Sequence, residues 1–226
     1  MNKNLTSTAW RRHSLLFRNP ALNQEQFSRH YETHHGPLAA SLEGFRKYCW
    51  RYVQNHVESL PDGREPRFHG ITMTSQVPRV DYRKGFFNEP DYEKVKPDEL
   101  YLFDVSRTVS VLGCEEPAEG GLPTPWKALL LAQPDFLDSW QPVGLTRKVL
   151  NSLDTSSASA LGFNSSQFSY GLLVELWFTS EAARDEAYAQ VAAQDFNSSA
   201  PFFLPVREVL IYGPEKPWTP SFTSVA

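Results

Sequence analysis

Cysteine is scarce in this sequence, with only Cys49 and Cys114 among 226 residues. Two isolated cysteines are too few for a disulfide framework or a CxxC metal site, so we expect both to be free thiols in packed positions. The chain also lacks an excess of basic residues. It has 22 Lys and Arg and 26 Asp and Glu, which gives a net charge of -4. Since no basic run interleaves with aromatic residues, the sequence predicts no nucleic-acid partner.

Long apolar runs are absent as well. No stretch approaches the ~20 apolar residues of a membrane span. The first residues, MNKNLTSTAWRRHSLLF, contain no apolar segment of signal-peptide length. We therefore expect a cytoplasmic protein with no membrane partner.

The glycine-rich loops that bind phosphates are also missing. The sequence contains neither GxGxxG nor GxxxxGKS/T, so it shows no cradle for a nucleotide cofactor. It has no GxSxG nucleophile elbow either. We expect an active site that works without a cofactor. Apolar and aromatic residues are plentiful, at 41% and 13% of the chain, which is enough for a packed interior and an aromatic-lined pocket.

Three short patterns occur twice, in the same order. They are LLFRNP and LLLAQP (15–20 and 129–134), FHGITMTSQ and SYGLLVELW (68–76 and 169–177), and GCEEP and GPEKP (113–117 and 213–217). Three pairs in register indicate the duplication of a unit of about 100 residues. We expect a first repeat over 1–116 that carries the site and a second, degenerate repeat over 117–226.

Hydrophobic periodicity and turn residues predict the elements of each half. The first half gives strands at 11–17, 45–55, 69–76 and 100–112, a helix at 24–34 and helical turns at 80–95, with a turn at 61–63. The second half gives strands at 127–131, 168–178 and 205–212, a helix ending near Leu153 and a helix at 181–194. The first half follows the β-α-β-β-α-β order of a ferredoxin-like unit, and the second repeats it more loosely.

A ferredoxin-like sheet carries helices on one face only, so its bare face has to be buried against another element. The sheet of the other half is the natural partner. The predicted fold class is therefore α+β, with tandem ferredoxin-like β-α-β-β-α-β repeats forming one barrel within a single chain. We expect the barrel interior to house the active site, and the chain to be a monomer or a homodimer.

The densest polar segment is NQEQFSRHYETHHGPLA, in which Asn23 caps a helix and Gln26 follows three residues later, as a capping box requires. Helical spacing places His30 and His34 on one face with two aromatic residues, and we expect this face to turn inward. Taken singly, each histidine could equally cap the helix and pack among the aromatics.

His35 comes next, and Gly36-Pro37 is expected to end the helix there. The helix dipole favours the charged form of a histidine at a helix C-terminus, which suits it to proton transfer. His30 and His34 also have the i, i+4 spacing of zinc-binding helices. Because Glu32 stands one place too late for an HExxH motif, we expect no metal.

The strand predicted to follow has an aromatic and polar face. Strict alternation places on it Tyr48, Trp50, Tyr52, Gln54 and His56. Such a face suits a pocket for a planar polar ligand, although an exposed or interface face would show the same pattern.

Two further polar positions are less well defined. His69 heads the neighbouring strand, where it either points into the same space or lies at the surface. Asp98 and Glu99 follow Pro97 at the expected start of a strand, and we interpret this pair as a solvated cap.

Two segments resemble the EthD-domain family. FSRHYETHHGPLAASLEGFRKYCWRYVQNHV (27–57) is similar to its core signature, and FFNEPDYEKVKPDELYLFD (86–104) is similar to a later segment. YGLLVELWFTSEAARDEA (170–187) looks like the glycine-strand-helix segment of the family, but the second half has no His-Gly-Pro. The resemblance implies a dimeric α+β barrel, normally made by two chains, with one working site per chain here.

The resemblance also implies an activity. EthD-like proteins of polyketide gene clusters act as dehydratases, decarboxylases or cyclases on aromatic precursors, while relatives of the same fold are cofactor-free oxygenases, isomerases or haem proteins. By this resemblance His35 takes the family's histidine position, together with Tyr52, Gln54 and His56 on the strand.

The leading hypothesis is a cofactor-independent lyase or cyclase acting on an aromatic, polyketide-like intermediate of secondary metabolism. His35 would move a proton at an acidic carbon, with His30 or His56 as the complementary acid. Tyr52 and Gln54 would hold the phenol or carbonyl oxygen. The remaining predicted substrate-binding residues are Trp50, Tyr48, His34 and His69. The alternatives are a cofactor-free oxygenase of anthrone-like substrates, a non-enzymatic binding protein for a reactive intermediate and a haem enzyme.

Overall fold

The structure is a computed structural model that describes residues 10–77, 86–160, 168–194 and 200–217. These residues form nine strands, which are β1 (Trp10–Leu16), β2 (Cys49–Val57), β3 (Gly70–Gln76), β4 (Val109–Glu115), β5 (Glu119–Gly120), β6 (Trp126–Ala132), β7 (Leu145–Ala160), β8 (Leu172–Phe178) and β9 (Phe202–Tyr212). Eight of them form a closed antiparallel barrel in the order β4-β1-β3-β2-β9-β6-β8-β7, and β7 pairs with β4 to close the ring. The short β5 pairs with β7 beside the ring. The predicted α+β barrel is confirmed.

The two halves of the ring have matching strand orders. β1 to β4 lie in the order β4-β1-β3-β2, and β6 to β9 lie in the order β9-β6-β8-β7. The two halves meet at two places in the ring, where β2 pairs with β9 and β4 pairs with β7. At each of these junctions the second strand of one half pairs with the fourth strand of the other, the short β5 not being counted. This is the order of two ferredoxin-like units, while their origin by duplication stays a prediction.

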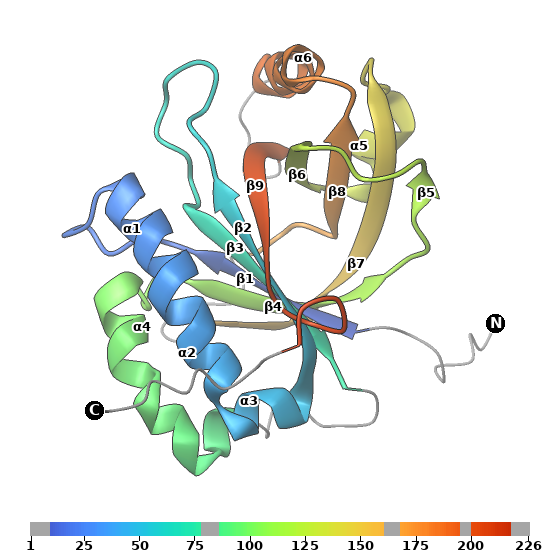
Figure 1. Cartoon of the computed structure of the whole chain (residues 1–226). Coiled ribbons are helices and arrows are strands. Elements are labelled where there is room, and N and C mark those ends of the chain that lie inside the picture. The colour runs from blue at the N-terminus through green and yellow to red at the C-terminus, as the bar shows by residue number, and fades with distance from the viewer. Residues whose placement is uncertain (1–9, 78–85, 161–167, 195–199, 218–226) are drawn as a thin grey trace.

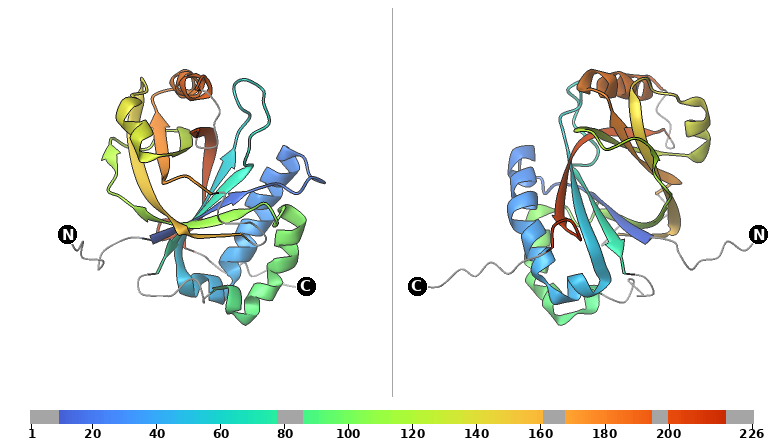
Figure 2. Two further views of the ribbon diagram at one scale, coloured as in Figure 1. Left: turned by 180° about the vertical axis from the view of Figure 1, so that it is seen from behind. Right: turned by 45° about the vertical axis from the view of Figure 1, so that its right-hand side comes forward.

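The helices lie outside the barrel. Those of the first half are α1 (Gln24–His30), the π-helix η1 (Tyr31–His35), α2 (Gly36–Ser41), α3 (Glu43–Tyr48), the short 3-10 helices η2 (Phe86–Asn88) and η3 (Pro90–Lys94), and α4 (Lys96–Leu102). The second half has α5 (Pro134–Ser139) and α6 (Glu181–Ala192). The two groups of helices cover separate parts of the sheet (Figures 1 and 2). None of the helices in the described residues is long and apolar enough to cross a membrane.

The core has one inner and two outer regions. Inside the barrel, apolar side chains of both halves pack together, among them Leu15, Ile71, Leu129 and Leu173. Outside it, one region lies beneath the helices of the first half and another beneath α5 and α6. Any space between sheet and helices is therefore separate from the barrel interior.

Several predicted boundaries were wrong. The strand expected at 45–55 begins only at Cys49, because the residues before it form α3. The strand expected at 100–112 begins at Val109, since Pro97 and the two acidic residues after it start α4. The helix expected to end near Leu153 stops at Ser139 and is followed by β7, with Gly144 at a φ of 76° in the turn between them. Of the helical turns expected at 80–95, residues 80–85 lie outside the described residues.

The helix of the histidines does not end at Gly36-Pro37, contrary to the prediction. It continues to Ser41 through η1, in which the Gly36 N–H bonds the carbonyl of Tyr31 five residues back. Proline lacks the N–H of a regular helical bond and clashes with the carbonyl four residues earlier. The wider π turn accommodates Pro37 inside the helix. His35 therefore lies within the helix, and the argument from a helix C-terminus does not apply to it.

The cysteines are as expected. Cys49 is buried at the start of β2, Cys114 is half-buried in β4, and both are free thiols. Burial raises the pKa of the Cys49 thiol, so this cysteine is unreactive in the folded protein.

Candidate active site

A cavity lies between the outer face of the first half-sheet and its helices, with a volume of about 90 Å³. This is several times the ~10–15 Å³ that holds one water molecule. The strands contribute mainly hydroxyl side chains: Ser14, Tyr52, Thr72, Thr74 and Ser110. The helical layer contributes mainly aromatic rings, among them Phe45, Phe86, Phe87 and Phe103. The cavity is outside the barrel, so the prediction of a site in the barrel interior was wrong.

His35 lines this cavity from the last position of η1. It is buried, and its Nδ1 lies 2.8 Å from Oδ2 of Asp98, the second residue after the start of α4. The ring of Phe103 packs edge-on against the imidazole at 5.1 Å. Nδ1 is therefore used by the carboxylate, and Nε2 is the nitrogen left for a substrate. A histidine oriented by a carboxylate in this way is a common general base.

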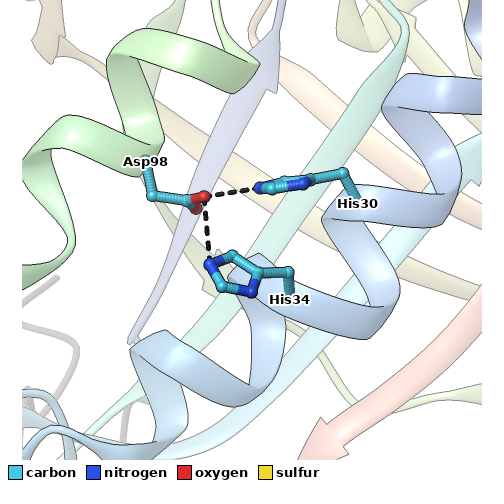
Figure 3. Close-up of side chains that lie close together, drawn as sticks. All are labelled: His30, His34 and Asp98. Atoms are coloured by element: carbon cyan, nitrogen blue, oxygen red, sulfur yellow. Dashed lines mark hydrogen bonds and ion pairs between the residues drawn. The ribbon is translucent and has the colours of Figure 1, made fainter.

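Asp98 is shared by three histidines. His30 Nε2 contacts Oδ1 directly, and His34 Nε2 lies 3.6 Å from the same oxygen (Figure 3). Burial acts to raise the pKa of Asp98, but the bonds from His35 and His30 outweigh it and lower the pKa below its usual value. Asp98 is therefore ionised at neutral pH. The sequence interpretation of Asp98 as a solvated cap was wrong.

His30, His34 and Asp98 form the cluster most suited to a metal ion in the described part of the chain. Their three ligand atoms lie within 4.8 Å of one another. Two imidazoles and one carboxylate are a donor set that transition metals accept. His34 is 60% exposed at its side chain, so the expected inward face of His30 and His34 is only partly formed.

Glu99 is a second acid of the cavity that the sequence analysis treated as a solvated cap. It lines the cavity and accepts a hydrogen bond of 2.7 Å from the Tyr92 hydroxyl. Burial raises its pKa above the usual glutamate value. A buried carboxyl group with a raised pKa can act as a general acid.

Arg12 also lines the cavity and was missed by the sequence analysis. Its side chain comes from the outer face of β1 and is buried, and its guanidinium lies 6.0 Å from the centre of the Phe87 ring. A buried guanidinium favours a negative charge nearby. The sequence WRRH gives no sign that Arg12 is buried. Its three polar residues alternate between the two faces of the strand, and the sequence does not show which face the helices cover.

Tyr52 is the one cavity residue that the sequence analysis took from the aromatic strand. Its hydroxyl accepts a hydrogen bond of 2.9 Å from Nε2 of Gln54, which is fully buried behind it. Burial raises the pKa of the Tyr52 hydroxyl, so this group is neutral and can donate a proton in a hydrogen bond. Gln54 itself is not among the lining residues.

Two predicted binding residues of the same strand do not line the cavity. Tyr48 belongs to α3, and its hydroxyl bonds Glu89 at 2.8 Å. The pairing of β2 with β3 shifts between Cys49 and Arg51, which makes Trp50 the extra residue of a β-bulge. Trp50 is 40% exposed. The alternation that placed these aromatics on one face is broken at this bulge.

His56 and His69 lie elsewhere. His56 borders an open groove beside α1, where its Nδ1 contacts Ser28 Oγ at 2.7 Å. His69 accepts from the Arg18 N–H at 3.2 Å and contacts Glu65 at 3.0 Å, so both of its ring nitrogens have partners away from the cavity. The structure thus brings His35 and Tyr52 together, keeps Gln54 and His56 behind them, and separates His69.

The closed antiparallel barrel of eight strands is the fold of dimeric α+β barrel proteins. Residues 19–106 match the EthD domain, the family that the sequence resembles.

Among solved structures, an anthrone oxidase-like protein superposes with a TM-score of 0.55 at 10% identity, covering 94% of this chain and 97% of that one. A candidate monooxygenase from Lactobacillus acidophilus NCFM matches with a TM-score of 0.44 at 5% identity, covering 90% and 95%. At 10% identity the match to the anthrone oxidase-like protein bears on the fold alone. No curated protein matches the sequence significantly.

Proposed function

We propose that this protein is a cofactor-independent lyase or cyclase that acts on an aromatic, polyketide-like intermediate. The observation that carries the proposal is the His35–Asp98 pair at the wall of a cavity that also contains a neutral Tyr52 and a Glu99 with a raised pKa. A base, an acid and a hydrogen-bond donor in one cavity are what proton abstraction beside a carbonyl requires.

A dehydration illustrates how these groups would act. Nε2 of His35 takes a proton from the carbon next to a ketone, and the developing enolate oxygen accepts a hydrogen bond from Tyr52. The electron pair then expels a hydroxyl group from the adjacent carbon, which leaves as water with the proton of Glu99. Asp98 stabilises the imidazolium formed in the first step. In a decarboxylation, Arg12 is the group positioned to bind the substrate carboxylate.

The same initial proton abstraction would also start a cofactor-free oxidation of an anthrone-like substrate. One similar structure is described as anthrone oxidase-like. In that reaction the carbanion formed by His35 would react with molecular oxygen instead of losing a leaving group. We keep this oxygenase as the second candidate.

Incubation with candidate aromatic polyketides, followed by mass spectrometry, tests the proposal. A product that has lost water or carbon dioxide supports the lyase. A product of equal mass, or one that has lost water, with a changed retention time indicates a cyclisation. A product that has gained oxygen supports the oxygenase. Tight binding without any change of the ligand, in a panel that includes β-hydroxy ketones and β-keto acids, would instead show a binding protein. His35→Ala serves as the inactive control.

Two structural proposals accompany this function. The matching strand orders of the two halves support an internal duplication with units at 1–116 and 117–226. Because both junctions of the ring are formed within one chain, a monomer already closes the barrel. Sedimentation analysis distinguishes this monomer from a homodimer.

A further inference from the structure

Three polar side chains form a continuous hydrogen-bonded row from the open groove beside α1 to Tyr52 at the cavity wall. Ser28 Oγ lies 2.7 Å from Nδ1 of His56, and Nε2 of His56 lies 3.2 Å from Oε1 of Gln54. Nε2 of Gln54 lies 2.9 Å from the Tyr52 hydroxyl. We call this arrangement the Ser28–Tyr52 row.

One backbone group fixes the direction of the hydrogens on Gln54, His56 and Ser28. Nε2 of Gln54 lies 2.7 Å from the carbonyl oxygen of Tyr31, which can only accept. The amide NH₂ must therefore point to this carbonyl, and its second N–H donates to the Tyr52 oxygen. The amide oxygen of Gln54 is then left to accept from His56.

His56 consequently has one defined tautomer. Since the amide oxygen of Gln54 can only accept, Nε2 of His56 carries the hydrogen and Nδ1 accepts from the Ser28 hydroxyl. Burial, followed by the charge of Arg207, lowers the pKa of His56 to about 4, while Glu32 acts in the opposite direction. The ring is neutral at pH 7, as this arrangement requires.

The donors of Ser28, His56 and Gln54 thus all point toward Tyr52. The Tyr52 oxygen accepts from Gln54 and also has the Tyr31 hydroxyl as a hydrogen-bond partner, which itself contacts Thr72 Oγ1 at 2.6 Å. With Tyr31 donating to this oxygen, the O–H of Tyr52 is left to donate into the cavity that Tyr52 lines. We propose that Gln54, His56 and Ser28 are positioning residues that hold the Tyr52 O–H directed at the substrate oxygen. This inference rests on the proposed function, in which Tyr52 binds that oxygen. Hydrogen bonds aligned in one direction also polarise one another, which strengthens the last donor.

The π turn explains how Gln54 reaches its place. A Cβ at Gly36 would lie 2.9 Å from Nε2 of Gln54, so the glycine makes room for the amide. The Tyr31 carbonyl that orients this amide is also the acceptor of the Gly36 N–H in the π turn. The segment that carries His35 therefore orients the Tyr52 hydroxyl as well.

A reversed amide would have the opposite effect. If the oxygen of residue 54 faced Tyr52, the hydroxyl would donate to it and present its lone pairs to the cavity. An enolate or phenolate oxygen would then meet an acceptor where it needs a donor. Gln54→Glu imposes this reversal with almost no change of shape, because a carboxylate offers no N–H.

The first part of the test needs no substrate. ¹⁵N NMR of the imidazole rings at pH 7, with His56→Asn to assign the signal, reports the tautomer of His56. The proposal expects the Nε2–H form. A ring protonated at Nδ1 alone, or on both nitrogens, would reverse or break the row and overturn the inference, whatever the protein catalyses.

The second part uses 1,8-dihydroxyanthraquinone as a probe, with binding followed by its visible absorption. Tyr52→Phe is expected to weaken binding by about 3–10-fold, which is the usual effect of losing one hydrogen bond. Gln54→Glu should weaken it at least as much, and the double variant should bind no more weakly than the weaker single variant. Gln26→Glu, which adds the same charge at an exposed position of α1, should bind like the wild type.

The outcomes separate the two proposals. If the effects of Tyr52→Phe and Gln54→Glu add in the double variant, Gln54 does not act through Tyr52 and the inference is wrong, while the proposed function stands. If the wild type does not bind the probe, the proposed substrate class and the role of the row toward it both fail. Should Gln54→Glu not fold, Ser28→Ala replaces it, with an expected weakening of about 2-fold that disappears in the Tyr52→Phe background.

Discussion

The outer faces of the two half-sheets differ in chemistry at corresponding strands. In the first half, β1 and β3 present Arg12, Ser14, Thr72 and Thr74 to the helices. In the second half, β6 and β8 present Ala128, Leu130, Val174 and Leu176 to α5 and α6. The apolar face is packed against α6, whereas the polar face leaves a cavity. One strand order thus supports either a filled layer or a site, and a few alternating positions decide which.

The helices that cover these faces differ as well. All six histidines of the chain precede residue 70, so neither α6 nor any other part of the second half carries one. The first half has a helix widened by a π turn at His35, whereas α6 is a regular helix capped by Ser180. The proposed chemistry therefore belongs to the first half.

The largest expected effect is the loss of activity in His35→Ala. Turnover of the polyketide identified by mass change should fall by about 10²- to 10⁴-fold, because a general base usually contributes that much. His34→Ala is the matched control, since His34 is exposed and 3.6 Å from the same carboxylate, and it should stay within about 2-fold. Equal losses in both variants would mean that the histidine cluster, and not the His35 base, supports the reaction.

The next effect concerns the charges that join the halves inside the barrel. Lys127 is fully buried and bonds Glu175 at 2.6 Å, and Glu175 also bonds Arg11 of the first half at 2.7 Å. Burial acts to raise the pKa of Glu175, but Lys127 and Arg11 lower it to about 2. Lys127→Ala should lower the free energy of unfolding by about 3–5 kcal/mol in urea denaturation, since it leaves a buried carboxylate short of a partner.

The control for this variant is Lys148→Ala, whose partner is the exposed Glu119 at 3.0 Å. An exposed ion pair of this kind should cost under about 1 kcal/mol. Because the ion pairs of Lys127 and Glu175 include both halves, we expect one cooperative unfolding transition, and its midpoint should shift as a whole in Lys127→Ala. Two separate transitions in Lys127→Ala would show that the halves unfold independently.

Acid should destabilise the protein through histidines of the first half. Burial lowers the pKa of His56 to about 4 and that of His13 to about 3, against 6.5 in an exposed chain. The unfolded chain therefore binds protons first, and the free energy of unfolding falls as the pH drops from about 6.5 toward 4. For His56 the loss is about 2–3 kcal/mol between pH 6.5 and pH 4.5.

Urea denaturation at pH 6.5 and pH 4.5 measures this loss. His56→Gln should remove the part of the pH dependence that comes from His56 and keep the part that comes from His13. Glu175 contributes little in this range, because its stabilisation is lost mainly as the pH falls from its ordinary pKa of 4.5 toward its folded pKa of about 2. An unchanged pH dependence in His56→Gln would show that His56 is not buried in its neutral form.

The sequence predicted the barrel correctly, while its placement of the site in the first half stays a prediction. Alternation and turn residues found the core of β1, β3, β6, β8 and β9, because these strands are regular and lie between clear turns. The capping box of α1 was also correct. EthD-like segments then pointed to His35 and Tyr52, which line one cavity.

The errors have a common physical origin in contacts between distant segments. Nothing in the local pattern shows that Pro37 is accommodated by a π turn, so the helix was ended too early. Asp98 is 63 residues from His35 in sequence, and only the packing of α4 against η1 brings them to 2.8 Å. Glu99 was misinterpreted and Arg12 was missed for the same reason, because the burial of both depends on how the helices pack on the sheet.

The smallest effect is expected for Trp50→Ala, which tests the face of β2 that the sequence misassigned. Trp50 is the extra residue of the bulge and is 40% exposed, so its replacement should change the free energy of unfolding by under about 1 kcal/mol and turnover by under about 2-fold. Tyr52→Phe, two residues further on, should reduce turnover by about 10-fold or more, since it removes an oxyanion donor. If Trp50→Ala instead raised KM strongly, the bulge would close over the substrate in the bound state. Trp50 would then bind the substrate, as the strict alternation in the sequence predicted. Comparable turnover in the two variants would remove Tyr52 from the site.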